Sequence, residues 1–298
     1  MIQIKELKKQ VGSFLLNEIT FELPMGYIMG LIGPNGSGKT TLLHLLLGLY
    51  RRDAGELVID GKTYPEAEKE LRNQIGVVLQ ERRFEDYRTL RENGVFYGRY
   101  YENYRQERFE ELLIRFELEP ERKYKALSKG EELKFQFAFA LSYAPKLLLL
   151  DEPTGNFDPE FRDEFFEILK EFIDDGEHSV ILATHLTQDL DRIADYITYL
   201  EKGKLLFSMD VEELHDTWRL VSGERWQLNK VPQEDLISVE EGSFGVKALV
   251  RHHRRYTYEG LQVAVPTIEE LMYFMSKRNA PQERSRTVRN MHLKGWSF

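Results

Sequence analysis

The sequence predicts an α/β fold, and three observations support that prediction. First, segments 27–32, 75–79 and 146–150 are almost entirely apolar, which is typical of parallel strands buried on both faces. Second, a glycine-rich turn at 33–38 joins the first of these strands to a Leu-rich helix. Third, polar and apolar residues alternate from about residue 217 onward, so a small α+β unit is expected after the main core.

Length and composition suit one large domain, or one domain with an appendix. The chain has 298 residues, of which 42% are hydrophobic and 31% charged. Its apolar runs are far shorter than the roughly 18 residues that span a bilayer, and residues 1–7 alternate like a strand, unlike a signal peptide. The absence of cysteine excludes disulfides and thiol catalysis. A net charge of −9 argues against broad nucleic-acid binding, so no nucleic-acid partner is expected.

The strongest single signal is a phosphate-binding loop. Its three glycines let the backbone curl so that N–H groups point at phosphate oxygens, and the helix predicted at 41–49 adds its positive end. Lys39 is expected to reach the β- and γ-phosphates, and the Thr40 hydroxyl to ligate Mg²⁺. A nucleoside triphosphate site is therefore predicted, built from Gly33, Pro34, Asn35, Gly36, Ser37, Gly38, Lys39, Thr40 and Thr41.

Two acids end the apolar run at 146–150. Ligands of open α/β sheets collect at the carboxyl ends of strands, so Asp151 and Glu152 should lie beside the phosphate loop. Asp151 would hold the Mg²⁺ shell, usually through water, and Glu152 would orient or deprotonate the water that attacks the γ-phosphate. The pair predicts hydrolysis, since a kinase would need an acceptor site and no signature of one is evident.

The segment 127–131, Leu-Ser-Lys-Gly-Glu, lies between these two motifs. Ser128 and Glu131 are spaced as a capping box that opens a helix predicted at 131–143. This arrangement leaves a hydroxyl, the flexible Gly130 and free helix N–H groups available to an anion. Taken alone, the segment predicts a simple helix cap as readily as an anion site.

Surrounding motifs decide between these two interpretations. Gln80 and His185 each follow an apolar strand, and Asn-Phe-Asp-Pro at 156–159 follows the acidic pair. In this order the motifs resemble the Q-loop, signature (LSGGQ), D-loop and switch histidine of the ABC ATPases. The segment at 53–61 also resembles the hairpin that follows the first helix in that family. The resemblance covers about residues 1–210.

The resemblance implies a P-loop ABC ATPase core with an antiparallel β lobe and a helical subdomain at about 85–145. It also implies two subunits that face each other head to tail around two ATP molecules. Thr40, Gln80 and Asp151 would serve as metal ligands, and Asp158 would link the two sites across the interface. The residues implied around each ATP are Lys39, Thr40, Gln80, Asp151, Glu152 and His185 of one chain and Ser128 and Gly130 of the other, with Lys39, Gln80, Glu152 and His185 as the catalytic set.

The sequence departs from the family pattern at three places. The position of the usual adenine-stacking aromatic falls near Gln10 and Val11, and Phe14 is the nearest aromatic. Lys129 adds a positive charge beside the expected phosphates of the partner. Glu131 replaces a neutral amide with an acid but keeps the capping role.

A transporter is the expected context. Compared with DNA-repair and translation members of the family, the chain has no room for a long coiled coil or zinc sites and carries one cassette. Phe84, Tyr87 and nearby arginines fall where transporter members receive a short helix of the membrane subunit, although they could equally be core of the helical subdomain. The expected partners are a second copy or a related ATPase, and polytopic membrane subunits that hold the chain at the cytoplasmic face of the membrane. The alternative is an ATP-driven switch that acts on a soluble or nucleic-acid partner.

Residues 211–298 are expected to form a small accessory domain with a basic tail. This layout resembles the C-terminal unit of single-cassette subunits from drug-, lantibiotic- and peptide-exporting systems, which implies export of peptides, antibiotics or lipids. The tail after Lys277 ends on Trp296 and Phe298, and either is solvated or contacts anionic lipid or the membrane partner. The elements predicted here are strands at 218–221, 237–239, 246–250 and 261–265, a helix from Pro266, and an exposed basic hairpin face at 251–255.

Overall fold

A computed structural model describes residues 1–242, 245–253 and 258–278. The chain divides into two compact units, Met1–Asp216 and Thr217–Phe298. The division falls slightly beyond the expected boundary at residue 210. Helix α8 (Val211–Thr217) accounts for the difference, because its first N–H group, that of Val211, donates to the Asp195 carbonyl of the first unit at 2.9 Å. In the described ranges no helix is both long and apolar enough to cross a membrane.

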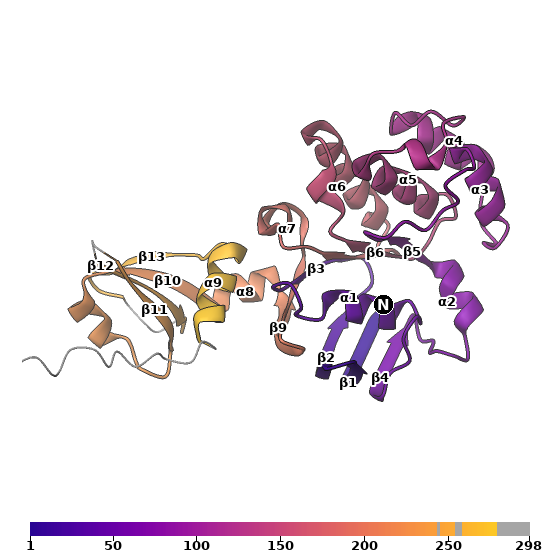
Figure 1. Ribbon diagram of the computed structural model, residues 1–298. Helices are drawn as coiled ribbons and strands as arrows, with labels where there is room; N and C mark the ends of the chain where they lie inside the picture. Colours follow the sequence, from indigo (N-terminus) through magenta and orange to yellow (C-terminus); the bar gives the residue numbers. More distant parts are fainter. Residues whose placement is uncertain (243–244, 254–257, 279–298) are drawn as a thin grey trace, which may run out of the picture. The chain divides into compact units, whose positions relative to one another are not determined.

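A six-stranded sheet forms the centre of the first unit (Figure 1). All neighbouring strands are parallel except the last two, which form a hairpin through Lys202 and Gly203. Strands β3 (Ile28–Ile32), β6 (Leu147–Asp151) and β7 (Ser179–Ala183) are buried at every residue, because helices or the second sheet cover both faces. In spatial order the strands are β5 (Ile75–Val78), β6 (Leu147–Asp151), β7 (Ser179–Ala183), β3 (Ile28–Ile32), β8 (Tyr196–Glu201) and β9 (Lys204–Asp210).

A three-stranded antiparallel sheet forms the β lobe, in the order β2 (Phe14–Leu23), β1 (Ile2–Val11) and β4 (Ala54–Ile59). The predicted hairpin at 53–61 is limited to a tight turn at its end, where Ile59 and Lys62 exchange backbone hydrogen bonds of 2.8 and 2.9 Å around Asp60 and Gly61. Strand β4 itself pairs with β1. Helix α1 (Lys39–Leu46) lies between this sheet and the six-stranded one (Figure 1). Four leucines of α1 share one core with both sheets, which fixes the helix directly after the phosphate loop.

Helices cover the other face of the six-stranded sheet (Figure 1). They are α3 (Leu90–Gly98), α4 (Gln106–Arg115), α5 (Lys129–Leu141) and α6 (Pro159–Ile173), with α2 (Glu68–Gln74), α7 (Thr187–Ile193) and the 3₁₀ turns η1 (Tyr124–Ala126) and η2 (Pro153–Asn156) joining the layers. Two predicted helix starts are two residues late. Helix α1 begins at Lys39 because Gly38 is its N-cap, and α5 begins at Lys129 because Ser128 is its N-cap.

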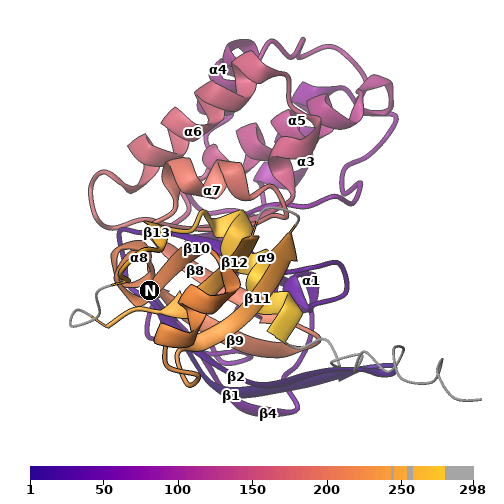
Figure 2. The same ribbon diagram turned by 90° about the vertical axis from the view of Figure 1, so that its left-hand side faces the viewer.

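The second unit is a four-stranded antiparallel sheet, on which α9 (Ile268–Arg278) packs against β11 and β12 (Figure 2). Its strands are β11 (Leu236–Gly242), β12 (Gly245–Arg251), β10 (Trp218–Gly223) and β13 (Gln262–Ala264), so all four predicted strands are confirmed. The 3₁₀ turn η3 (Arg225–Lys230) was not predicted. The unit has its own apolar core. The basic tail from residue 279 on, and Arg254 and Arg255, lie outside the described residues.

Candidate nucleotide site

The glycine-rich loop connects β3 to α1. Gly33 has a φ of 152°, and a Cβ atom there would lie 2.2 Å from the Leu200 carbonyl oxygen, so only glycine fits. Gly38, at φ 110°, gives α1 no side-chain cap, which leaves N–H groups of the first turn for an anion. The hydroxyl of Ser37 is buried without a hydrogen-bond partner in the described structure. A phosphate oxygen in the loop would satisfy these donors.

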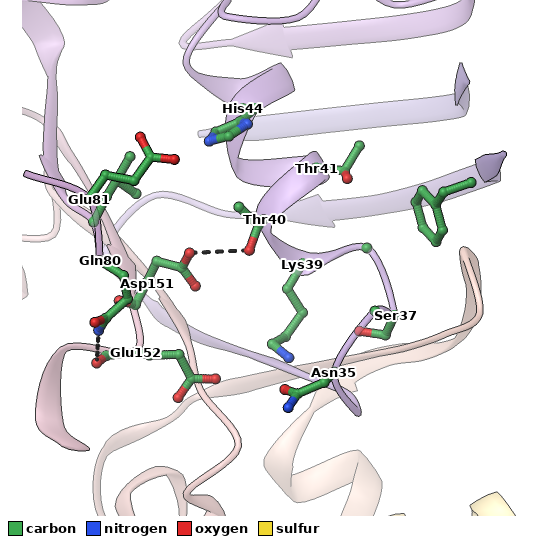
Figure 3. A pocket seen from close by; sticks show the side chains of 14 residues that line it. Asn35, Ser37, Lys39, Thr40, Thr41, His44, Gln80, Glu81, Asp151 and Glu152 are labelled. Atoms are coloured by element: carbon green, nitrogen blue, oxygen red, sulfur yellow. Dashed lines mark hydrogen bonds between the residues drawn. The ribbon is translucent and has the colours of Figure 1, made fainter. Parts of the chain in front are cut away.

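Lys39 supplies a buried cation to this loop. Its ammonium donates a 2.7 Å hydrogen bond to the Gly33 carbonyl. Burial lowers the pKa of Lys39, and the charges of Glu152 and Asp151 oppose that shift. The Lys39 side chain extends from α1 into the space that these acids face (Figure 3). A phosphate in the loop would therefore add a negative charge beside this buried amine.

Asp151 ends β6 opposite Thr40. The Thr40 hydroxyl donates to the Asp151 carboxylate at 3.2 Å (Figure 3). Burial raises the pKa of Asp151 and Glu152 adds to the rise, whereas Thr40 and the charges of Lys39 and His44 oppose it. A hydroxyl and a carboxylate side by side are the oxygen donors that Mg²⁺ prefers. No group of three or more His, Asp or Glu side chains that could hold a metal occurs in the part of the chain that the structure describes, so phosphate and water oxygens would complete such a shell.

Glu152 lies where the loops after three strands meet. Its carboxylate accepts from the backbone N–H of His185 at 3.2 Å and lies 2.7 Å from the Nδ1 atom of that ring. The Thr184 hydroxyl donates to the same oxygen at 3.3 Å. Gln80 donates through Nε2 to the backbone carbonyl of Glu152 at 2.7 Å and to that of Asp151 at 3.3 Å. Gln80, Asp151, Glu152 and His185, far apart in sequence, are thus brought together.

The phosphate loop and the two acids line one cavity of about 500 Å³. Its lining residues are Phe14, Asn35, Gly36, Ser37, Gly38, Lys39, Thr40, Thr41, His44, Leu79, Gln80, Glu81, Asp151 and Glu152 (Figure 3). Phe14, the aromatic nearest to the family's adenine-stacking position, is among them. His44 was missed by the sequence analysis, although its spacing of four from Thr40 places it one helical turn further along α1. Three residues predicted around the nucleotide of the same chain, Gly33, Pro34 and His185, do not line this cavity.

The signature and D-loop residues lie away from it. Ser128 and Glu131 form the predicted capping box, with hydrogen bonds of 3.3 and 2.7 Å. A Cβ atom on Gly130 would lie 2.4 Å from the Asn156 carbonyl oxygen, so signature and D-loop touch within one chain. Asp158 caps α6 by accepting from the Phe161 N–H at 2.8 Å. None of Ser128, Gly130 and Asp158 lines the cavity of the phosphate loop.

Lys129 makes an unexpected contact within the chain. Its ammonium donates to the backbone carbonyl of Gln80 and lies 3.7 Å from the Glu132 carboxylate. The Lys129 ammonium is therefore bound by Gln80 and Glu132 of its own chain. These contacts compete with the expected position of its charge beside the phosphates of a partner. The side chain ties the start of α5 to the segment after β5.

Phe84 is largely part of the aromatic core of the helical subdomain. Its ring packs within 5.6 Å of the ring centroids of Tyr97, Tyr124, Phe135 and Phe139. It also lines a second cavity of about 270 Å³, together with Leu47, Leu49, Tyr64, Arg72, Ile75, Val77, Arg83, Tyr97, Tyr101, Gln136, Phe139 and Tyr143. Tyr87 is 76% exposed and does not line this second cavity.

These observations define a P-loop ATPase with a helical subdomain inserted between its loop and its acid pair. Residues 16–155 match the family model described as ABC transporter. The chain is 30% identical over 220 residues to an uncharacterized ABC transporter ATP-binding protein, YdbJ, of Bacillus subtilis, covering 73% of this chain and 71% of that protein. The chain belongs to the family of ABC transporter ATP-binding proteins. It is therefore an ATP-binding and ATP-hydrolysing subunit, and the predicted fold class is confirmed.

Other relatives act in both directions of transport. The chain is 33% identical to the Nod factor export ATP-binding protein I of Burkholderia lata, covering 68% of each chain. It is also 33% identical to the sulfate/thiosulfate import ATP-binding protein CysA of a Synechocystis species, covering 78% of this chain and 67% of that one. Among solved structures, the dimeric bacterial ABC transporter cassette MJ0796 aligns with a TM-score of 0.63 at 27% identity, covering 71% of this chain and 99% of MJ0796.

Proposed function

We propose that ATP binds in the cavity of the phosphate loop and that Glu152 is the base of hydrolysis. Lys39 and the loop N–H groups would hold the β- and γ-phosphates, and Phe14 would contact the base. Glu152 would take a proton from the attacking water, while His185 and Gln80 hold that carboxylate and its loop in place. The observation that carries this proposal is the meeting of Lys39, Asp151 and Glu152 in one cavity.

Thr40 and Asp151 would hold Mg²⁺, with the amide oxygen of Gln80 as a third ligand. The metal, when bound, neutralises charge on the β- and γ-phosphates. The Thr40 hydroxyl lies 3.2 Å from the Asp151 carboxylate, and this proximity supports the assignment of both as metal ligands. The raised pKa of Asp151 also supports it, since a carboxylate that is costly to bury alone gains from a cation.

The active form would be a head-to-tail dimer with a second copy or a related ATPase. Ser128 and Gly130 lie outside the phosphate-loop cavity of their own chain, which fits a role at the ATP of a partner. The capped start of α5 presents backbone N–H groups that suit the γ-phosphate. Asp158 at the start of α6 would connect the two sites. The dimeric structure of MJ0796 supports this arrangement.

Glu152→Gln tests the catalytic assignment and the dimer together. We expect the variant to bind ATP but lose turnover by 100-fold or more, and to elute as a dimer with ATP and Mg²⁺ in size-exclusion chromatography. Glu18→Gln, an exposed acid in β2, is the matched control and should keep wild-type turnover. Retained turnover in Glu152→Gln would remove Glu152 as the base. A variant that loses turnover but stays monomeric would count against pairing without the membrane subunit.

The second cavity would receive a short cytoplasmic helix of a membrane subunit, which would hold the chain at the cytoplasmic face of the membrane. Its lining is aromatic and aliphatic, the composition of an interface anchor. Arg72 and Arg83 are the charged residues of the lining, so the docking helix would carry an acidic side chain. Arg83→Glu should abolish co-purification with the membrane subunit and spare ATP binding. The sequence also placed Tyr87 in this groove, but Tyr87 does not line the cavity. If the cavity is the docking site, Tyr87→Ala should co-purify normally and serves as the control.

Export is the proposed direction, with peptides, antibiotics or lipids as the class of cargo. The small α+β unit after residue 217 and the similarity to Nod factor export proteins support export, although CysA is an import protein. Inside-out vesicles that contain the complete transporter test the direction. Uptake of cargo into such vesicles on addition of ATP is the expected result, and ATP-driven release of preloaded cargo would mean import.

A further inference from the structure

A buried carboxylate outside the cavity joins the loops that carry the catalytic residues. Asp189, on α7, is 1% exposed, and Thr154, in η2, is 2% exposed. The Thr154 hydroxyl donates a 2.6 Å hydrogen bond to one carboxylate oxygen of Asp189. The guanidinium group of Arg162, on α6, donates to the other oxygen. The sequence analysis assigned no role to any of these three residues.

The three residues of this cluster lie on segments that carry or adjoin the proposed catalytic residues. Thr154 comes two residues after Glu152, and Asp189 comes four residues after His185. Arg162 lies in the first turn or so of α6, which Asp158 caps. The Asp189 carboxylate therefore binds the loop after β6 to the helix after β7 and to the helix after the D-loop. These are the segments that determine how far Glu152 lies from His185.

The cluster is better suited to fixing geometry than to adding stability. Burying a carboxylate has a large free-energy cost before its partners compensate, and a good apolar replacement is often as stable. The cost of burying this ion pair is not fully compensated, since the Nε atom of Arg162 is buried with no partner in the described part of the chain. Hydrogen bonds to fixed lone pairs, however, set the distance between segments more narrowly than apolar contact does.

The backbone of Glu152 needs neighbouring residues to hold its conformation. Its backbone is in the left-handed region, at φ 50° and ψ 45°, a conformation that costs a non-glycine residue free energy and persists only when neighbours hold it. The carboxylate of Glu152 is held by His185 and Thr184, but these residues are themselves on a loop. Asp189 adds a further, buried connection between the loop after β6 and helix α7, besides the bonds that Glu152 itself makes to Ala183, Thr184 and His185.

We infer that Asp189 is a positioning residue for hydrolysis, acting through Thr154 on the loop of Glu152 and through α7 on His185. This inference rests on the proposed role of Glu152. Loss of the Thr154–Asp189 bond would let the two loops drift apart, so that Glu152 and the attacking water no longer align. Because the cluster lies outside the cavity lining, ATP binding would be spared. The effect would fall on kcat and leave KM almost unchanged.

Four variants of the full chain, with ATP and Mg²⁺, test the inference. Asp189→Asn removes the charge, and Thr154→Val removes the hydroxyl at nearly constant volume. We expect each to lower kcat by about tenfold or more, with KM for ATP within about twofold, because small misplacements of reacting groups cost that much. Thr154→Ser keeps the hydroxyl and should restore turnover. Asp163→Asn is the matched control, since Asp163 pairs with Arg192 at 2.9 Å across the same helices, α6 and α7, without touching the loop of Glu152.

The outcomes separate the possibilities. Wild-type kcat in folded Asp189→Asn and Thr154→Val would overturn the inference, as would an equal loss in Asp163→Asn, which would indicate general helix packing. Thermal denaturation shows that each variant is folded at the assay temperature; if Asp189→Asn fails to fold, Thr154→Val and its Ser counterpart still decide. Glu152→Gln in the same assay distinguishes failure of the proposed base from failure of the Asp189 inference. If Glu152→Gln keeps turnover, the proposed base is wrong, whatever the Asp189 variants do.

Discussion

The Nδ1 atom of His185 lies 2.7 Å from the carboxylate of Glu152, across 33 residues of sequence. The contact joins the ends of two adjacent parallel strands, β6 and β7, and leaves the His185 ring 60% exposed. One side of the ring is therefore fixed by the proposed base, while the other remains accessible to solvent or to a phosphate. This geometry makes the pair sensitive to substitution at either member.

His185→Ala should lower ATP turnover by at least about tenfold, the scale of a lost catalytic hydrogen bond. Equilibrium binding of ATP should change little, because the ring does not line the cavity of the phosphate loop. Steady-state phosphate release and binding of a fluorescent ATP analogue measure the two quantities. His178→Ala is the control, since this histidine pairs with Asp175 far from the site. Equal turnover in the two variants would contradict a role for His185.

Asp151→Asn should stabilise the nucleotide-free protein while abolishing turnover. The pKa of Asp151 is raised in the folded state, mainly by burial. Between its ordinary value and this raised value the folded chain holds a proton that the unfolded chain has lost, so stability falls as the pH rises through that window. At pH 7.5 the melting temperature of the variant should exceed that of wild type by on the order of 2 °C.

Two observations check the sign of that prediction. The gain should shrink as the pH falls toward 3.8, the ordinary pKa of an aspartate. Asp53→Asn should behave in the opposite way, because Lys9 lowers the pKa of Asp53 and its ionised form stabilises the fold above that range. Differential scanning calorimetry across pH provides both curves. A loss of stability in Asp151→Asn at neutral pH would show that its contact with Thr40 outweighs the burial cost.

Gly130→Ala should impair turnover through the D-loop. The new Cβ atom would meet the Asn156 carbonyl oxygen at 2.4 Å, and backbone atoms at such a distance must shift. We expect turnover to fall about tenfold, with ATP binding by the isolated chain retained. Gly155→Ala is the control, since its Cβ atom would meet nothing within 4 Å. Similar turnover in both variants would mean that signature and D-loop need not touch during the reaction.

Phe84→Ala should destabilise the protein, whereas Tyr87→Ala should not. The ring of Phe84 contacts four other aromatic rings, while Tyr87 is largely exposed. A loss of about 2 kcal/mol or more is expected for Phe84→Ala, toward the lower end for a core phenylalanine because it is only half-buried. Urea denaturation at constant pH measures both. An unchanged midpoint for Phe84→Ala would favour a pure docking role.

Local patterns in the sequence were sufficient to predict the core of the fold and most of the candidate site. A glycine-rich turn, an acidic pair after an apolar run and a polar residue after each further strand all depend on neighbours in the chain. The role of β4 as a partner of β1 could not be read locally, since strand pairing depends on long-range packing. The same limit applies to the contact of Thr154 with Asp189, which joins two unremarkable residues 35 positions apart.

Among the described residues, one apolar core lies within the ATPase unit and another within the C-terminal unit, and this has an evolutionary consequence. Residues of the first core come from both sheets of the ATPase unit, and those of the second come only from residues after 217. The alignment with YdbJ spans 220 residues, about the length of the unit Met1–Asp216. The side chains described in one core do not recur in the other, so each core can be repacked by substitutions within its own unit. The packing of the C-terminal core can therefore change in the course of evolution without a change in the residues that build the nucleotide site.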